Sequence, residues 1–169
     1  MKKLLLTAAA VFAFGFANAQ EGGFKVGVNA GMPIGTAGDA YTFSGGIDAA
    51  YMWNIADKFN VGATTGYTYF AGKSITIPAG FFGTTTIKSN GGFIPVAGTA
   101  QYSLTDNLFV GTDLGYAVYA GDGNADGGVY YQPKFGFQTE KIELYAGYKG
   151  IAVTGGSIAS VGLGFNYKF

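Results

Sequence analysis

Six charged residues in this chain have the types and positions to form a site in its interior. The acids are Asp48, Asp113 and Glu143, and the lysines are Lys25, Lys134 and Lys149. All six lie in runs where apolar and polar residues alternate, and each falls on the polar side. Such a set predicts a network of ion pairs in a narrow lumen, because unpaired charges would be costly there. A pair of carboxylates for acid–base catalysis is the alternative. The sequence does not give the individual pairs.

The residues needed for most other chemistry are missing. The chain has no histidine to act as a general base, and no cysteine to act as a nucleophile, thiolate ligand or disulfide partner. It also has no arginine. We therefore expect that the protein is not an enzyme and needs no cofactor.

One loop carries part of a calcium-binding motif. In GDGNADGG, residues 121–128, Asp122, Asn124 and Asp126 precede Gly127 and match the start of a D-x-N-x-D-G loop. The bidentate glutamate that should close the loop is replaced by Pro133. Asn, Asp and Gly are also common in solvated turns. The three residues are therefore a weak calcium candidate, and a plain turn is the alternative.

The six charged residues must be positioned by strands, because the alternation recurs eight times along the chain. The alternating runs are 23–32, 40–53, 59–70, 93–104, 108–118, 129–137, 142–149 and 161–169. Short connections at 54–58, 105–107 and 139–141 alternate with longer ones at 33–39, 71–91, 120–128 and 150–156. The pattern predicts an all-β fold, an eight-stranded antiparallel up-and-down transmembrane β-barrel.

The two faces of these strands indicate which side is outward. One face is bulky and apolar, and the other is mostly small or polar and holds every charge within the strands. A narrow eight-stranded interior fits the small face but not the bulky one. An outward apolar band of this size needs lipid around it. Aromatic residues near both strand ends, with aliphatic residues between them, predict two interfacial girdles.

The first residues predict export. Lys2 and Lys3 precede an apolar run from Leu4 to Ala17, and Ala17-Asn18-Ala19 is a small-x-small cleavage pattern. A membrane anchor is the alternative, but this run is shorter than the roughly 20 residues of a spanning helix. We expect a signal peptide at 1–19 and a barrel domain at 20–169. Without Lys2 and Lys3 the acids outnumber the lysines, so no basic patch predicts nucleic-acid binding.

The final stretch VGLGFNYKF carries a resemblance to a known family. Together with the signal peptide and eight strands, it resembles the small outer-membrane β-barrel proteins of Gram-negative bacteria, such as OmpX and the N-terminal barrel of OmpA. The resemblance implies a monomer in outer-membrane lipid, assembled by periplasmic chaperones and the barrel assembly machinery. It also implies that Phe165, Tyr167 and Phe169 form the assembly signal. Such barrels often carry interior arginine–glutamate pairs, whereas this chain has only lysines.

Three roles fit such a barrel. The first is structural: it spans the outer membrane and presents external loops. The second is adhesion or recognition of an external protein through the long loop 71–91, where we expect a hairpin tipped by Phe81 and Phe82 that could accept a partner strand. A flexible loop, or one folded over the barrel mouth, is the alternative for this stretch. The third is a narrow ion channel, although an eight-stranded barrel is about filled by its own side chains, here including Phe109, Tyr130 and Tyr145.

Overall fold

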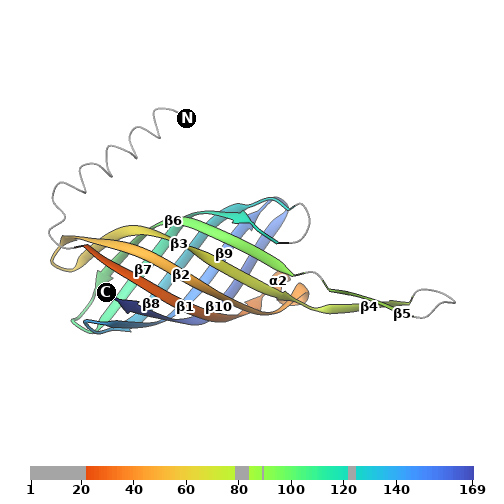
Figure 1. Ribbon diagram of the computed structural model, residues 1–169, viewed down its shortest axis with the longest axis horizontal. Helices are drawn as coiled ribbons and strands as arrows, with labels where there is room; N and C mark the ends of the chain where they lie inside the picture. Colours follow the sequence, from red (N-terminus) through yellow and green to blue (C-terminus); the bar gives the residue numbers. More distant parts are fainter. Residues whose placement is uncertain (1–21, 79–83, 89, 122–124) are drawn as a thin grey trace, which may run out of the picture.

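The computed structural model describes residues 22–78, 84–88, 90–121 and 125–169, and most of them form a closed antiparallel barrel (Figure 1). Around the barrel the strand order is β1-β10-β9-β8-β7-β6-β3-β2. The barrel strands are β1 (Gly22–Ile34), β2 (Tyr41–Ala56), β3 (Phe59–Gly72), β6 (Gly91–Ser103), β7 (Leu108–Tyr119), β8 (Gly128–Gln138), β9 (Ile142–Val153) and β10 (Gly156–Lys168). The predicted eight-stranded barrel is confirmed. In the described ranges, no helix has the length and hydropathy to cross a bilayer.

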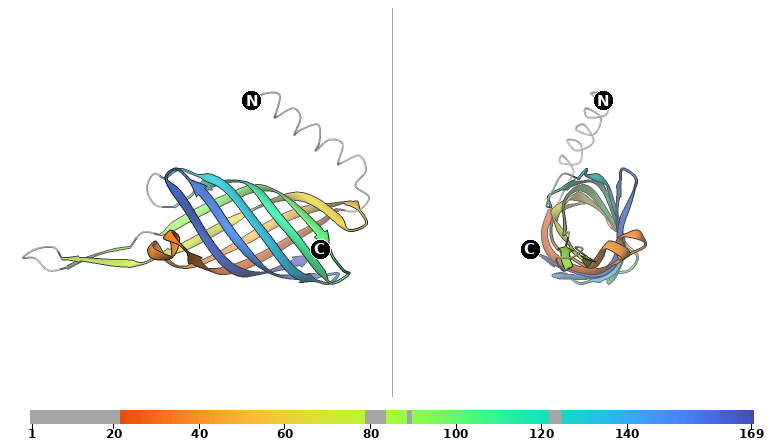
Figure 2. Two further views of the ribbon diagram at one scale, coloured as in Figure 1. Left: turned by 180° about the vertical axis from the view of Figure 1, so that it is seen from behind. Right: turned by 90° about the vertical axis from the view of Figure 1, so that its right-hand side faces the viewer.

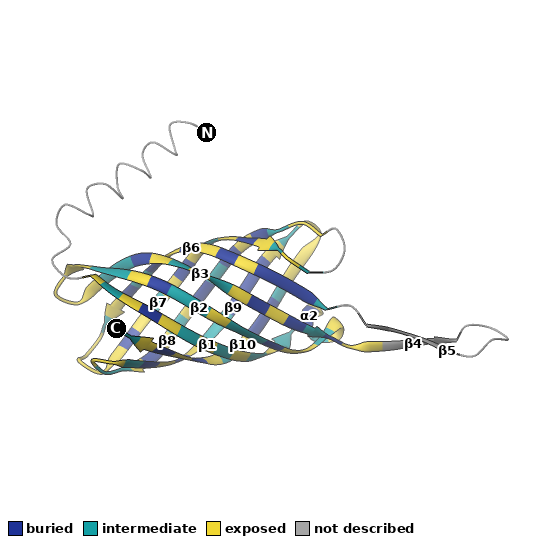
Figure 3. Ribbon diagram, viewed as in Figure 1, coloured by how far each residue is buried: buried dark blue, intermediate teal, exposed yellow. Residues whose placement is uncertain are grey.

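Exposure alternates along the strands as the sequence pattern predicts (Figure 3). Large apolar side chains point outward around the barrel: Leu163 is 70% exposed, Leu114 64% and Ile47 63%. The lysines and acids of the predicted network lie on the inner face. A surface this apolar cannot be stable in water, so the barrel requires a lipid surround.

The last connection differs from the prediction. Residues 150–156 were expected to form a long loop, but β9 continues to Val153 and β10 starts at Gly156. Val153 and Gly156 pair directly, and Gly155 takes a φ of +85° that favours glycine. The β-favouring residues of 151–153 extend the hairpin, and the connection is a tight two-residue turn.

Tyr41 departs from the outward face that the alternation in the run 40–53 predicts for it. The β2–β3 register shifts between Tyr41 and Phe43, so one residue of β2 is left without a partner. Tyr41 is half-buried, with its ring 5.5 Å from that of the buried Phe70. The irregularity breaks the strict alternation that the prediction assumed.

The long connection forms a separate hairpin, as expected. β4 (Ser74–Pro78) and β5 (Thr84–Lys88) pair as a two-stranded sheet that extends the β3–β6 side beyond the barrel (Figure 2). At its base, the Lys73 backbone N–H donates to the Ala40 carbonyl at 2.8 Å. Ala40 ends the short helix α2 (Thr36–Ala40), which contacts β10. The tip residues Phe81 and Phe82 and the predicted signal peptide lie outside the described residues.

We call the barrel end with the hairpin the loop end. The opposite end, where turns 57–58, 104–107 and 139–141 lie, is the short-turn end. In Figure 1 the loop end is on the right.

Candidate functional site: the barrel interior

An apolar cluster packs inside the barrel toward the loop end. Its buried members are Phe70, Phe93, Ala97, Ala117, Tyr130 and Ile151. The Phe70 and Phe93 rings meet edge to face, with their centroids 6.0 Å apart. The sequence reading named Tyr130 as an interior residue but missed most of this cluster. Phe70 and Phe93 could have been assigned to the interior from their positions in the sequence, because both fall on the polar side of the alternation in β3 and β6.

The middle of the lumen holds one complete ion pair. Lys134 Nζ on β8 donates to both carboxylate oxygens of Asp113 on β7, each at 2.8 Å. The same ammonium lies 5.4 Å from the centre of the Tyr145 ring, within range of a cation–π interaction. Asp113 is 3% exposed, so this carboxylate depends on Lys134 for compensation of its charge.

Lys149 and Asp48 are linked through an amide instead of directly. Lys149 Nζ donates to Asn29 Oδ1 and to Thr68 Oγ1, each at 3.0 Å. Asn29 Nδ2 then donates to Asp48 Oδ2 at 2.5 Å. The Asn29 amide is oriented by a cation on one side and an anion on the other.

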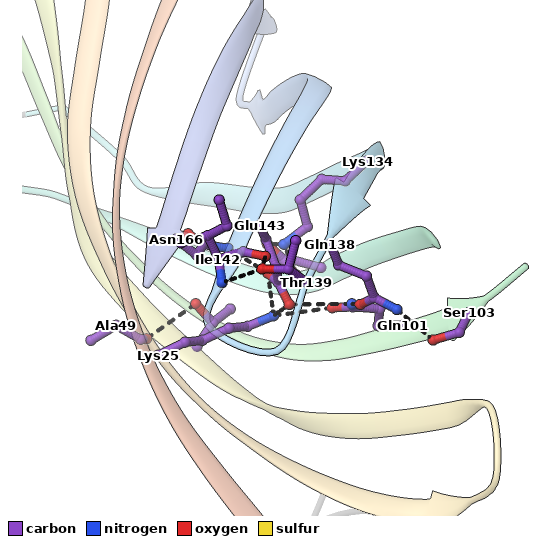
Figure 4. Close-up of polar contacts among 12 residues, drawn as sticks. Lys25, Ala49, Gln101, Ser103, Lys134, Gln138, Thr139, Ile142, Glu143 and Asn166 are labelled. Atoms are coloured by element: carbon purple, nitrogen blue, oxygen red, sulfur yellow. Dashed lines mark hydrogen bonds and ion pairs between the residues drawn. The ribbon is translucent and has the colours of Figure 1, made fainter. Parts of the chain in front are cut away.

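The third lysine lies near the short-turn end, in the most connected part of the network (Figure 4). Lys25 Nζ donates to Glu143 Oε2 at 2.9 Å and to Gln101 Oε1 at 3.0 Å. Asn166 Nδ2 donates to Glu143 Oε2 at 2.8 Å. Gln101 Nε2 donates to Gln138 Oε1 at 2.9 Å, which extends the network from β6 to β8.

The structure thus brings the six predicted residues together in one lumen. Two pairs are direct, Lys25 with Glu143 and Lys134 with Asp113. Sequence reasoning missed the amides that connect these charges, because Asn and Gln are unremarkable on a polar strand face. Within the described residues, every buried side-chain nitrogen and oxygen has a hydrogen-bond partner. Such a saturated network indicates a structural role for the acids, and the absence of enzyme activity stays a prediction.

Three cavities lined by described residues lie along the lumen. Two cavities of about 10 Å³ each lie beside Lys149 and between Asp48 and Lys134, and each has room for about one water molecule. A cavity of about 400 Å³ lies at the short-turn end, with Lys25, Gln101 and Glu143 in its lining. The lumen therefore changes along its axis from apolar packing, through ion pairs, to an open mouth.

The remaining predicted sites are only partly within the described residues. Asp126 is exposed, and Asp122 and Asn124 lie outside the described ranges, so calcium binding stays a prediction. Among the described residues, no cluster of three or more His, Cys, Asp or Glu side chains could hold a metal ion. Phe165 and Tyr167 face outward on β10, and the adjacent Phe169 is 74% exposed. Their role as an assembly signal also stays a prediction.

Comparisons with known proteins give the fold. No family model and no curated protein match the chain. Solved structures do match. Ail of Yersinia pestis in a phospholipid bilayer nanodisc is similar over 88% of this chain and 100% of its own, with a TM-score of 0.56 and 12% identity. The chain has the fold of a small transmembrane β-barrel.

Two further structures support this fold assignment. The crystal structure of Ail, the attachment invasion locus protein, with the heparin analogue sucrose octasulfate matches over 88% of this chain and 97% of its own, with a TM-score of 0.55 and 13% identity. A de novo designed transmembrane β-barrel matches over 87% of this chain and 95% of its own, with a TM-score of 0.53 and 13% identity. At these identities the likeness concerns the fold alone, because one fold hosts many functions.

Proposed function

We propose that this protein is a structural component of the bacterial outer membrane, with the short-turn end in the periplasm and the β4–β5 hairpin outside. The observation that carries this proposal is the contrast between the two faces of the barrel. The outer face has a broad apolar belt, and the inner face is filled by side chains whose buried polar groups are satisfied in the described ranges. Such a barrel is built to remain in lipid without transporting solute.

Membrane fractionation with gel migration tests the location. We expect the protein in the outer-membrane fraction, and we expect boiled and unboiled samples to migrate differently, because a closed barrel resists detergent until it is heated. A soluble protein whose migration is unaffected by boiling would contradict the proposal.

The packing inside the lumen argues against the alternative role as a narrow ion channel. The cluster around Phe70 and Phe93 packs across the loop end, and the two mid-lumen cavities each hold about one water. We therefore expect purified protein in a planar bilayer to show no steady conductance above the protein-free bilayer. Stepwise openings at the single-molecule level would favour the channel.

A second candidate function is recognition of an external protein through the hairpin. The observation that favours it is that β4 and β5 pair only with each other, so each strand has a free edge in the described sheet. A lone two-stranded sheet is marginally stable in water and gains hydrogen bonds when a partner strand is added.

Deleting residues 75–86 tests this candidate. The deletion removes most of the hairpin and leaves Lys73 and the barrel strands in place. We expect heat-modifiable migration to persist and binding of cells to host proteins or surfaces to fall. A deletion of 122–125, in another of the long connections, is the matched control. Unchanged surface binding after the hairpin deletion would remove the recognition role.

A further inference from the structure

The cavity at the short-turn end, here called the vestibule, has a built floor. The floor is the Lys25–Glu143 ion pair, with Gln101 bonded to both partners. Lys25 is 6% exposed, Gln101 5% and Glu143 2%, so these side chains are fixed by their own contacts. A ligand entering the mouth would therefore meet a preorganised polar surface.

The walls of the vestibule also carry two charged side chains that have no partner among the described residues. Lys168 and Glu140 both line it, and in the described part of the chain neither forms an ion pair. Neither side chain has a hydrogen-bond partner there. By contrast, the three lysines of the lumen network are paired with an acid or bonded to amide and hydroxyl groups. Among the described side chains that line it, the vestibule therefore offers one unpaired ammonium group, on Lys168, and one unpaired carboxylate, on Glu140.

Amide groups complete the walls. Asn54 and Asn60 face each other across the β2–β3 pair, and both line the vestibule with Gln138. Each amide side chain can donate and accept hydrogen bonds, as a peptide bond does. Met52 adds an apolar patch on the same wall. The volume of about 400 Å³ lies within the range of small-molecule sites.

We propose that the vestibule binds a short zwitterionic peptide. Lys168 pairs with the peptide carboxylate, and Glu140 pairs with its ammonium group. Asn54, Asn60 and Gln138 bond to the peptide groups between them. Access is from the short-turn end, because the ion pairs and the Phe70 cluster fill the lumen above the floor. This site goes beyond the structural role proposed above and does not depend on it.

Calorimetric titration of the refolded full chain in non-ionic detergent micelles tests the proposal. The probes are triglycine, N-acetyl-triglycine with a free carboxylate, triglycine amide with a free ammonium group, and N-acetyl-triglycine amide with neither. We expect saturable binding of triglycine at millimolar concentration. The doubly blocked peptide should bind about tenfold or more weakly, because a hydrogen bond to a charged group is lost at each end.

Two substitutions assign the two ends. Lys168→Gln should weaken N-acetyl-triglycine about tenfold and leave triglycine amide unchanged. Glu140→Gln should do the reverse. Lys58→Gln, in a turn at the same end but outside the vestibule lining, is the matched control and should change neither affinity. All three side chains are partly or fully exposed, so heat-modifiable migration should show folded barrels.

The proposal fails if triglycine does not bind saturably, or if the blocked and free peptides bind equally. It also fails if Lys58→Gln weakens binding as much as Lys168→Gln, because binding would then follow net charge.

Discussion

Lys25 Nζ lies 2.9 Å from Glu143 Oε2, and this ion pair joins β1 to β9 across the intervening β10. The barrel closes where β1 pairs with β10. Asn166 of β10 bonds to the same carboxylate, so one acid on β9 holds side chains from both strands of the closing seam. The pair therefore reinforces the seam from inside the lumen, in addition to the backbone ladder.

Removing Lys25 should destabilise the barrel more than removing the pair. Lys25→Met leaves the Glu143 carboxylate buried without a cation, and we expect a loss of about 3–5 kcal/mol in the free energy of unfolding. The double variant Lys25→Met with Glu143→Gln should recover most of that loss, since the neutral amide that replaces the carboxylate can still bond to Gln101 and Asn166. Urea unfolding in lipid vesicles measures both.

Lys58→Met, which removes a lysine from an exposed turn, is the control and should change stability by no more than about 0.5 kcal/mol. A double variant no more stable than Lys25→Met alone would mean that the loss does not come from leaving the Glu143 carboxylate unpaired.

The Gly164–Tyr145 contact predicts a size limit inside the lumen. These residues are directly paired on β10 and β9, and a Cβ on Gly164 would collide with the Tyr145 ring. We expect Gly164→Ala to cost about 1–3 kcal/mol in urea unfolding, because the buried ring must leave its position. Gly23→Ala is the control, since nothing lies within 4 Å of a Cβ there.

A smaller partner should relieve the clash. In the Tyr145→Leu background, Gly164→Ala should cost clearly less than in the native background. An equal cost in both backgrounds would mean that the substitution acts through the backbone of residue 164 and not through contact with the Tyr145 ring.

The sequence predicts the barrel well because two-residue periodicity is a direct consequence of strand geometry. Leu163 and Asn166 could be assigned to opposite faces from that period alone. The two-residue period could not predict the pairing of Lys25 with Glu143, because that pairing depends on the register of three strands. The same period places Phe70 on the inner face, but it could not predict that the Phe70 ring packs against Phe93 and Tyr41 there, since an apolar residue on the polar side carries no mark of its contacts. The tight turn at Gly155 was missed because a Gly-rich stretch resembles a loop.

A charge on the outer belt should destabilise the barrel according to its depth in lipid. Leu163 is 70% exposed near the middle of β10, and Leu163→Lys should cost about 2–4 kcal/mol of unfolding free energy in vesicles. Ile55, which is 47% exposed near the short-turn end of β2, is the comparison, and Ile55→Lys should cost about 0–1 kcal/mol. Equal costs at the two positions would contradict a lipid belt centred on Leu163.

Phe169 should matter more for assembly than for the stability of the finished barrel. Its ring is 74% exposed and packs on Phe24 and Tyr167, with centroid separations of 5.9 and 5.0 Å. Its backbone N–H donates to the Phe24 carbonyl, a bond that does not need the side chain. We expect Phe169→Ala to lower the unfolding free energy by less than about 1 kcal/mol. In cells, it should slow the appearance of the heat-modifiable form after a pulse of synthesis.

Phe137→Ala separates a signal from a general effect of aromatic residues in the girdle. Phe137 is 44% exposed, and it lies on the outer face at the same end of the barrel, on β8. If Phe169 is read during assembly, Phe137→Ala should assemble at the native rate even where its stability loss is the larger of the two. If both variants assemble equally slowly, the delay follows from the loss of interfacial aromatic anchoring, and Phe169 has no separate role as a signal.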